Sequence, residues 1–254
     1  MTAATNPLLE CNAVTVRFGG LEALSNLSLA IEAGGVLGIA GPNGAGKTTL
    51  FNVISGHVRA SQGEVRLDGR AITRMSPDRI FRLGVARTFQ IPEVIRTQSV
   101  FSNVLVGAHF AQDAGFATTL RFTPDSYRLA HAGMAAFELA AMAARLAGET
   151  SLFARKMVML ASAMARRPRL LLLDEPASGL TAGEADQILG KIRDVRALGT
   201  TVIVIEHVMR FLMAASDRLV ILNRGSVLFD GTPEEGRRSE QVRRLYFGKV
   251  TMGT

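Results

Sequence analysis

Eight consecutive residues, which follow the apolar run Val36–Ala40, have the composition of a phosphate-binding loop. They are Gly41-Pro42-Asn43-Gly44-Ala45-Gly46-Lys47-Thr48, which fits the pattern G-x-x-x-x-G-K-[ST]. Glycines let the backbone wrap closely around phosphates, so that successive N–H groups and the helix N-terminus point at negative charge. Lys47 can reach the β- and γ-phosphates, and the Thr48 hydroxyl can ligate Mg²⁺. Together with Thr49, these residues predict a site for a nucleoside triphosphate.

A second group of chemically active side chains follows an apolar run later in the chain. Four leucines, Leu170–Leu173, lead directly into Asp174 and Glu175. A buried strand here would deliver Asp174 to the carboxyl end of a sheet, where its carboxylate can hold the water shell of the metal opposite Thr48. Glu175 is then the natural general base for an attacking water. The two motifs together predict a hydrolytic site.

The stretches around these motifs predict an α/β core. The runs Val36–Ala40, Leu170–Asp174 and Thr201–Glu206 are continuously apolar or nearly so, and each precedes helix-compatible sequence, which is typical of buried parallel strands. Residues 8–32 instead carry short alternating apolar segments broken by Gly19-Gly20. That pattern is typical of antiparallel strands.

The middle of the chain has a different composition. Between about residues 100 and 167, alanine, methionine and leucine dominate, as in MAAFELAAMAARLAG, and we expect a helical subdomain. Short strands are expected again at Arg218–Leu222 and Val227–Phe229, before a polar tail that ends in short helical sequence. The predicted fold class is therefore α/β, a P-loop core with a flanking antiparallel β subdomain and a helical subdomain.

Composition and charge narrow the class of protein. The 254 residues are 48% hydrophobic and 20% charged, which excludes a disordered chain. Cys11 is the only cysteine, which excludes an intramolecular disulfide framework and a four-thiolate zinc site. No apolar run approaches the ~20 residues that span a bilayer, and the opening MTAATNPLLE lacks the features of a secretory signal, so we expect a cytosolic protein.

The net charge of +7 allows a partner such as nucleic acid or an anionic membrane surface. However, only four of the 29 basic residues are lysine, and the arginines are scattered and mixed with acidic residues rather than gathered in a block. A general coding bias towards arginine and alanine gives the same balance. The charge alone therefore does not predict nucleic-acid binding.

Taken together, these motifs make the chain resemble the nucleotide-binding subunit of an ABC transporter over nearly its whole length. Phe18 matches the aromatic residue that stacks on adenine, with a core aromatic of the strand as the alternative. Gln90, in Ala86-Arg87-Thr88-Phe89-Gln90, matches the glutamine that bridges metal and helical subdomain; a solvated loop amide is the alternative. His207, at the exit of the strand around Ile205, matches the histidine that contacts the γ-phosphate; it could instead only start a helix.

The resemblance implies catalytic roles for Glu175, His207 and Gln90, and a metal site formed by Thr48, Gln90 and Asp174. It implies ATP and Mg²⁺ as ligands, and one nucleotide-binding domain over residues 1–254 with a helical subdomain at about 92–167. The implied partners are integral membrane permease subunits, a second ATP-binding subunit and, indirectly, a periplasmic solute-binding protein, with no nucleic acid. The implied location is the cytoplasmic face of the inner membrane.

Further segments resemble the members that serve branched-chain amino acid importers. They are Ser76-Pro77-Asp78-Arg79-Ile80, Gly84–Gln90, the long helical insert, Asp230-Gly231-Thr232-Pro233 and Leu245-Tyr246-Phe247-Gly248. Related members energise urea or amide transport or lipopolysaccharide export. The membrane subunits choose the substrate, so the sequence predicts a branched-chain amino acid or a related small polar solute.

One motif departs from the family pattern. The signature L-S-G-G-Q or L-S-Y-G-Q should open the helix before Leu170, and an ungapped alignment places Thr150-Ser151-Leu152-Phe153-Ala154 there. Ser151 is kept, but the glycine becomes Phe153 and the glutamine becomes Ala154. The glycine N–H approaches the γ-phosphate held by the opposite subunit, and a phenyl group there obstructs that approach. Thr181 also stands where the family prefers an acid or amide at the end of the loop after Glu175.

ABC subunits form sandwiches in which each ATP lies between the P-loop of one subunit and the signature of the other. The residues that would act on this chain's own ATP look complete, whereas the partner's ATP would meet Phe153 and Ala154. We therefore expect a heterodimer with one competent and one degenerate site. The alternatives are a weakly active or regulatory nucleotide-binding cassette and a soluble ABC ATPase that acts on nucleic acid, although the chain carries neither a second cassette nor a long coiled-coil insertion.

Overall fold

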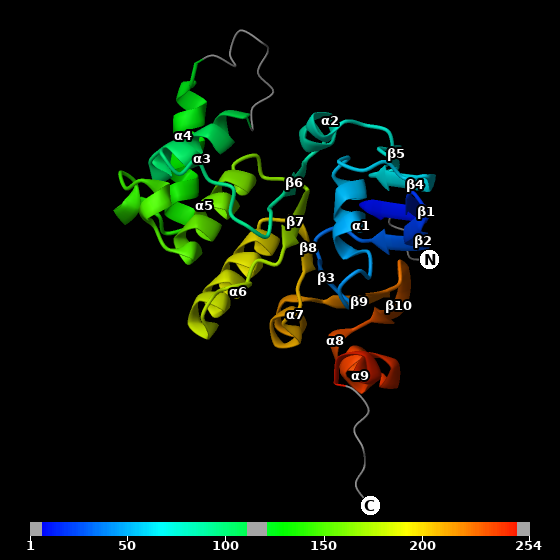
Figure 1. The fold of residues 1–254 in the computed structure, drawn as a ribbon. Coiled ribbons are helices and arrows are strands. Elements are labelled where there is room, and N and C mark those ends of the chain that lie inside the picture. The colour runs from blue at the N-terminus through cyan, green and yellow to red at the C-terminus, as the bar shows by residue number, and fades with distance from the viewer. Residues whose placement is uncertain (1–6, 111–120, 248–254) are drawn as a thin grey trace, which may run out of the picture. The chain divides into compact units, whose positions relative to one another are not determined.

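The computed structural model describes residues 7–110 and 121–247, which divide into two units (Figure 1). The first unit takes in the described residues up to Pro77 and from Thr201 onward, and the second covers residues 78–200. The first six residues of the opening stretch, Gly248 of the closing motif and positions 111–120 of the helical insert lie outside the described residues.

The first unit contains a four-stranded antiparallel sheet in the order β2-β1-β4-β5. Its strands are β1 (Leu9–Phe18), β2 (Leu21–Ile31), β4 (Gln62–Leu67) and β5 (Arg70–Ala71). Phe18 pairs with Leu21 across the Gly19-Gly20 turn, so the expected antiparallel strands are confirmed. In the last part of β2, Leu27, Leu29 and Ile31 are buried and the residues between them are exposed, as expected for a sheet that is covered on one face.

A second group of strands in this unit has β3 at its centre. Strand β3 (Val36–Ala40) is parallel to both β8 (Thr201–Ile205) and β9 (Arg218–Asn223), and β10 (Ser226–Gly231) pairs antiparallel with β9. Every residue of β3 and β8 is buried, which explains why both read as continuous apolar runs. The helices of the unit are α1 (Lys47–Ile54), α7 (Met209–Ala215), α8 (Pro233–Arg238) and α9 (Glu240–Phe247).

The second unit combines a parallel strand pair with helices. Strand β6 (Val85–Arg87) pairs with β7 (Leu170–Asp174), and all five residues of β7 are buried. Helices α3 (Val100–Phe110), α4 (Pro124–Ala136) and α5 (Leu152–Met164) pack on one another and form the green group of Figure 1. Helix α6 (Ala182–Ala197) follows β7, and the short α2 (Pro77–Arg82) precedes β6.

One stretch expected to be helical is broken. The alanine-rich segment at 134–148 is the end of α4 followed by two 3₁₀ turns, η2 (Ala140–Met142) and η3 (Ala147–Glu149). Glu138 has a φ of +56°, which ends the helix, and Lys191 binds both its carboxylate and the carbonyl of Ala136. A tertiary contact to α6 thus overrides the helix propensity of the alanines.

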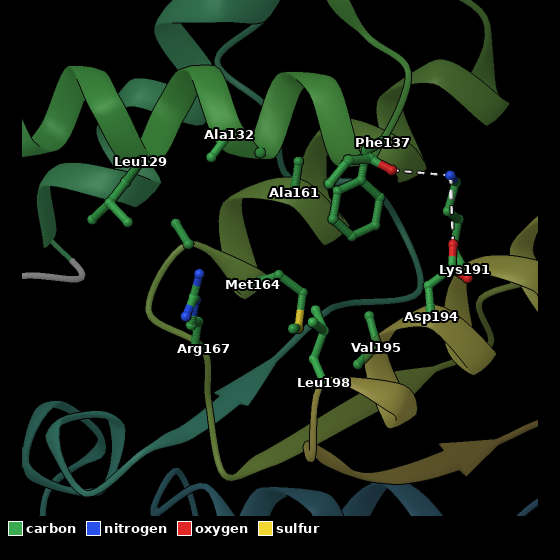
Figure 2. A pocket seen from close by; sticks show the side chains of 13 residues that line it. Leu129, Ala132, Phe137, Ala161, Met164, Arg167, Lys191, Asp194, Val195 and Leu198 are labelled. Carbon is green, nitrogen blue, oxygen red and sulfur yellow. Dashed lines mark hydrogen bonds and ion pairs between the residues drawn. The ribbon is translucent and has the colours of Figure 1, made fainter.

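A half-open pocket of about 140 Å³ lies between helices α4, α5 and α6 of the second unit (Figure 2). Its wall is mainly apolar, with Phe137, Met164 and Val195 among the lining residues and Arg167 and Lys191 at its sides. None of the residues predicted for nucleotide binding or catalysis lines it. Among residues 7–110 and 121–247, no helix combines the length and the apolar composition that crossing a bilayer requires.

Candidate nucleotide-binding and catalytic site

The loop between β3 and α1 has a backbone that excludes side chains at two glycines. A Cβ at Gly41 would lie 2.3 Å from the carbonyl oxygen of Leu222, and one at Gly46 would lie 2.6 Å from that of Ala23. Gly46 also has a φ of +101° and is the N-cap of α1, so no cap side chain accepts the first amides of the helix. These amides remain suited to an anion, as the sequence motif requires.

Lys47 is buried in this loop and holds its backbone. Its Nζ donates hydrogen bonds to the carbonyl oxygens of Gly41, at 2.7 Å, and Pro42, at 3.0 Å. The loop is also closed by a 3.1 Å hydrogen bond from the Ala45 amide to the Pro42 carbonyl. Thr48 is exposed and Thr49 half-buried in the first turn of α1, while Asn43 and Gly44 are exposed on the loop. The loop is therefore preformed around the ammonium group.

Two further predicted residues lie in the first unit. Phe18, the last residue of β1, is 50% exposed, so it is not the core aromatic that the sequence left open; its contact with adenine stays a prediction. His207 is exposed directly after β8, and its backbone N–H donates to the buried carboxylate of Glu206 at 3.1 Å. Glu206 thus fixes the backbone that carries the predicted γ-phosphate contact.

In the second unit, Asp174 is the last residue of β7 and forms a buried ion pair with Arg87. Its Oδ2 lies 3.1 Å from Nη2 of Arg87, which ends the neighbouring strand β6, and both side chains are less than a tenth exposed. The guanidinium carbon of Arg87 also lies 5.0 Å from the centre of the Phe89 ring, within the range of a cation–π contact. The carboxylate that the sequence predicts as a metal ligand is therefore paired with a positive charge in a buried position.

Glu175 is held at both its side chain and its backbone. The Gln90 amide nitrogen donates a 2.6 Å hydrogen bond to its Oε2, so the structure brings these two predicted residues together. The Glu175 carbonyl accepts from Nζ of Lys156 at 2.8 Å and from the Ser178 amide at 3.2 Å. Its φ of +48° lies in the left-handed region, which is rare for residues with a side chain and is found at functional sites.

Two residues of this arrangement carried no assigned role in the sequence analysis, Arg87 and Lys156. Arg87 stands inside the segment that carries Gln90, but nothing in the sequence places it beside Asp174. Lys156 is one of only four lysines and stands in an apolar helix, with Met157 and Val158 after it. A charge at a buried helix position signals a partner, which the sequence does not identify.

The altered signature segment starts helix α5. Ser151 is the N-cap, and its side chain accepts a 3.1 Å hydrogen bond from the Ala154 amide. Phe153 is half-buried in the first turn. Thr181 has a structural role of its own, because it caps α6 in a reciprocal pair with Glu184.

The donors that the motifs supply have the chemistry of a magnesium site. The hydroxyl of Thr48, the carboxylate of Asp174 and the amide oxygen of Gln90 are hard oxygen ligands, and Mg²⁺ is bound through few protein groups together with phosphates and water. The described residues contain no group of three or more His, Cys, Asp or Glu side chains that could hold a metal ion.

Comparisons with known proteins show which proteins the chain is similar to. The family model described as ABC transporter matches residues 24–178. The chain is 36% identical to the high-affinity branched-chain amino acid transport ATP-binding protein BraF of Pseudomonas aeruginosa, over 97% of this chain and 100% of that protein. It is 34% identical to LivG of Escherichia coli, which has the same description, over 97% and 100%.

Solved structures give the same result for the fold. An ATP-binding cassette of an ABC transporter superposes with a TM-score of 0.86 at 27% identity, covering 95% of this chain and 99% of that one. The ADP conformation of such a cassette superposes with a TM-score of 0.85 at 27% identity, covering 96% and 100%. The predicted α/β fold class is confirmed.

Proposed function

The chain belongs to the ABC transporter family, and from that premise we propose that it hydrolyses ATP for an importer of branched-chain amino acids or a related small polar solute. Family membership supports the general assignment, which is an ATP-binding subunit that works with membrane permeases. The solute class is inferred from the relatives BraF and LivG, whose names specify branched-chain amino acids.

The observation that carries the catalytic proposal is the fixed position of Glu175. Glu175 directly follows the buried Asp174. Its carboxylate accepts a hydrogen bond from Gln90, and its main-chain carbonyl accepts one from Lys156. In the proposed reaction Glu175 accepts a proton from the water that attacks the γ-phosphate. His207 contacts the γ-phosphate, and Phe18 stacks on adenine.

The loop residues bind the nucleotide and orient its phosphates. We infer that the backbone of Gly41–Thr49 and the Lys47 ammonium bind the β- and γ-phosphates. Thr48, Gln90 and Asp174 would hold Mg²⁺, which when bound supplies positive charge against the phosphate oxygens. Lys47 already occupies the loop through the carbonyls of Gly41 and Pro42, so little rearrangement of the backbone is needed.

The partners and the domain organisation form the second part of the proposal. Residues 1–254 act as one nucleotide-binding domain in which the helical subdomain at about 92–167, next to Gln90, couples ATP to the permeases. The subunit lies on the cytoplasmic face of the inner membrane, receives solute indirectly from a periplasmic binding protein, and pairs with a second cassette. A heterodimer is favoured because Phe153 replaces the signature glycine on this chain.

The test is a reconstituted transporter in liposomes, with candidate permeases and a candidate partner cassette. We expect ATP hydrolysis that solute-loaded binding protein stimulates for leucine, isoleucine or valine, and that Glu175→Gln abolishes. Stimulation only by a chemically different solute would overturn the solute class and leave the ATPase assignment standing.

Phe153 also favours a second candidate, a regulatory cassette that binds ATP without turning it over. In that case the complete transporter would bind nucleotide tightly at this chain, and Glu175→Gln would leave its turnover unchanged. The catalytic proposal requires the opposite result from the same variant.

A further inference from the structure

Lys156 is a buried cation whose position the nucleotide motifs do not explain. It lies in the second turn of α5, is 2% exposed, and donates a 2.8 Å hydrogen bond from Nζ to the carbonyl oxygen of Glu175. Removing an ammonium group from water is costly unless it is hydrogen-bonded, and bonds from a charged donor are about twice as strong as neutral ones. The contact is therefore a strong link between α5 and the residue after β7.

The carbonyl that Lys156 holds belongs to a backbone in an unfavourable conformation. Glu175 has a φ of +48°, which residues with a side chain adopt only where their surroundings enforce it. The turn that follows supplies one hydrogen bond to this carbonyl, from the Ser178 amide at 3.2 Å. The shorter bond from Lys156 is the stronger of the two and fixes the direction of the peptide group.

A second contact links the start of α5 to the same turn. A Cβ on Gly179 would lie 2.9 Å from Cδ2 of Leu152, so the first residue of α5 lies directly against the backbone of Gly179. Leu152 belongs to the altered signature segment capped by Ser151. Helix α5 thus makes two contacts with the chain from Glu175 to Gly179, one through Lys156 and one through Leu152 of the altered signature segment.

We propose that Lys156 is a positioning residue that sets the backbone of Glu175, and that it couples the start of α5 to this subunit's own catalytic carboxylate. The proposal rests on the proposed function for the role of Glu175. In this arrangement a shift of α5 caused by nucleotide on the partner moves the peptide that carries Glu175. Lys156 acts through Glu175 and needs no contact with ATP.

The first experiment measures hydrogen exchange of the purified full chain without nucleotide. In Lys156→Met, the Ser178 amide should exchange about 10-fold faster or more, because the carbonyl that accepts its hydrogen bond loses its charged donor. Lys191→Met is the matched control, since Lys191 also binds a main-chain carbonyl, that of Ala136, at 2.9 Å. Unchanged exchange at Ser178 in Lys156→Met would overturn the proposal.

Two more conservative substitutions keep the test valid if Lys156→Met does not fold. Lys156→Arg keeps the charge and should restore most of the protection, and Lys156→Gln keeps a donor without charge and should give an intermediate rate. Equal exchange in the arginine and methionine variants, both folded, would show that the ammonium contact does not hold this turn.

The second experiment measures ATP hydrolysis with the partner cassette. Lys156→Met should lower kcat about 10-fold with KM for ATP within about two-fold, and Lys156→Arg should recover most of kcat. A purely structural role would instead leave kcat unchanged or weaken ATP binding together with turnover. If the wild-type mixture does not hydrolyse ATP, the proposed function fails, and the exchange experiment still decides the position of Lys156.

Discussion

The side-chain amide of Gln90 donates a 2.6 Å hydrogen bond to Oε2 of Glu175. Gln90 follows β6 and Glu175 follows β7, so the pairing of these two parallel strands brings together residues that are far apart in the sequence. The carboxylate proposed as general base thus has its orientation fixed by the glutamine proposed to sense the helical subdomain. A change at Gln90 is expected to reach Glu175 directly.

Removing the Gln90 amide should reduce turnover more than nucleotide binding. In Gln90→Ala the Glu175 carboxylate loses a charge-assisted hydrogen bond, and we expect kcat to fall about 10-fold or more. Steady-state hydrolysis with the partner cassette and ATP binding by fluorescence separate the two effects. Gln98→Ala, an exposed glutamine in the same unit, should behave as wild type. Normal kcat in Gln90→Ala would contradict the role given to this contact.

The ion pair between Arg87 and Asp174 should be necessary for stability. Both side chains are buried, so Arg87→Met removes the positive charge beside the Asp174 carboxylate and should lower the free energy of unfolding by about 3–5 kcal/mol. Urea denaturation followed by circular dichroism measures this loss. The exposed pair of Arg128 and Asp125 supplies the control, because Arg128→Met should change stability by less than about 1 kcal/mol. Equal losses for the two variants would contradict the difference in burial.

Restoring the glycine and glutamine of the signature should increase ATP hydrolysis. The double variant Phe153→Gly with Ala154→Gln restores the family pattern, and hydrolysis by the chain alone should rise about 10-fold or more as one charge-assisted hydrogen bond to ATP returns. Glycine in the first turn of α5 should cost about 1 kcal/mol of stability, which thermal unfolding measures. If the chain alone is already as active as its mixture with the partner, Phe153 does not impair the second site.

Cys11 should be chemically inert in the folded protein. Burial raises the pKa of its thiol to about 12, so the nucleophilic thiolate is suppressed at neutral pH. We expect a thiol reagent to label Cys11 at about pH 8 only after unfolding. Because the unfolded chain releases this proton at lower pH than the folded one, the thiol's contribution to stability should decline as pH rises above about 9. Rapid labelling of the native protein would show that β1 opens.

The sequence alone was sufficient to predict the strands that are buried on both faces. Strands β3, β7 and β8 appear as apolar runs whose ends match the structure within a residue, since every position of each strand is buried. Strand β4 was not predicted, because it begins with three polar or glycine residues and only its later residues alternate. The alanine-rich stretch at 134–148 misled the prediction, because Lys191 and the backbone of Glu138 end α4 there.

The residues of the candidate site also fall into two groups, those that the sequence predicts and those that it does not. The phosphate-binding loop and the Asp174–Glu175 pair have local patterns, so the sequence alone was enough to predict them. The basic residues that contact this pair have no such local pattern. Strand pairing brings Arg87 to Asp174. Helix packing brings Lys156 to the carbonyl of Glu175. Tertiary contacts decide which basic residue holds which carboxylate or carbonyl, and one sequence carries no record of them.

The role of Glu175 and the need for a partner are tested together by steady-state ATP hydrolysis of the purified chain, alone and mixed with a candidate partner cassette. Glu175→Gln serves as the blank, because loss of the general base should lower turnover about a hundred-fold or more while ATP still binds. We predict strong hydrolysis in the mixture, little by the chain alone, and none above the blank with Glu175→Gln. Undiminished turnover by a mixture that carries Glu175→Gln would contradict this prediction.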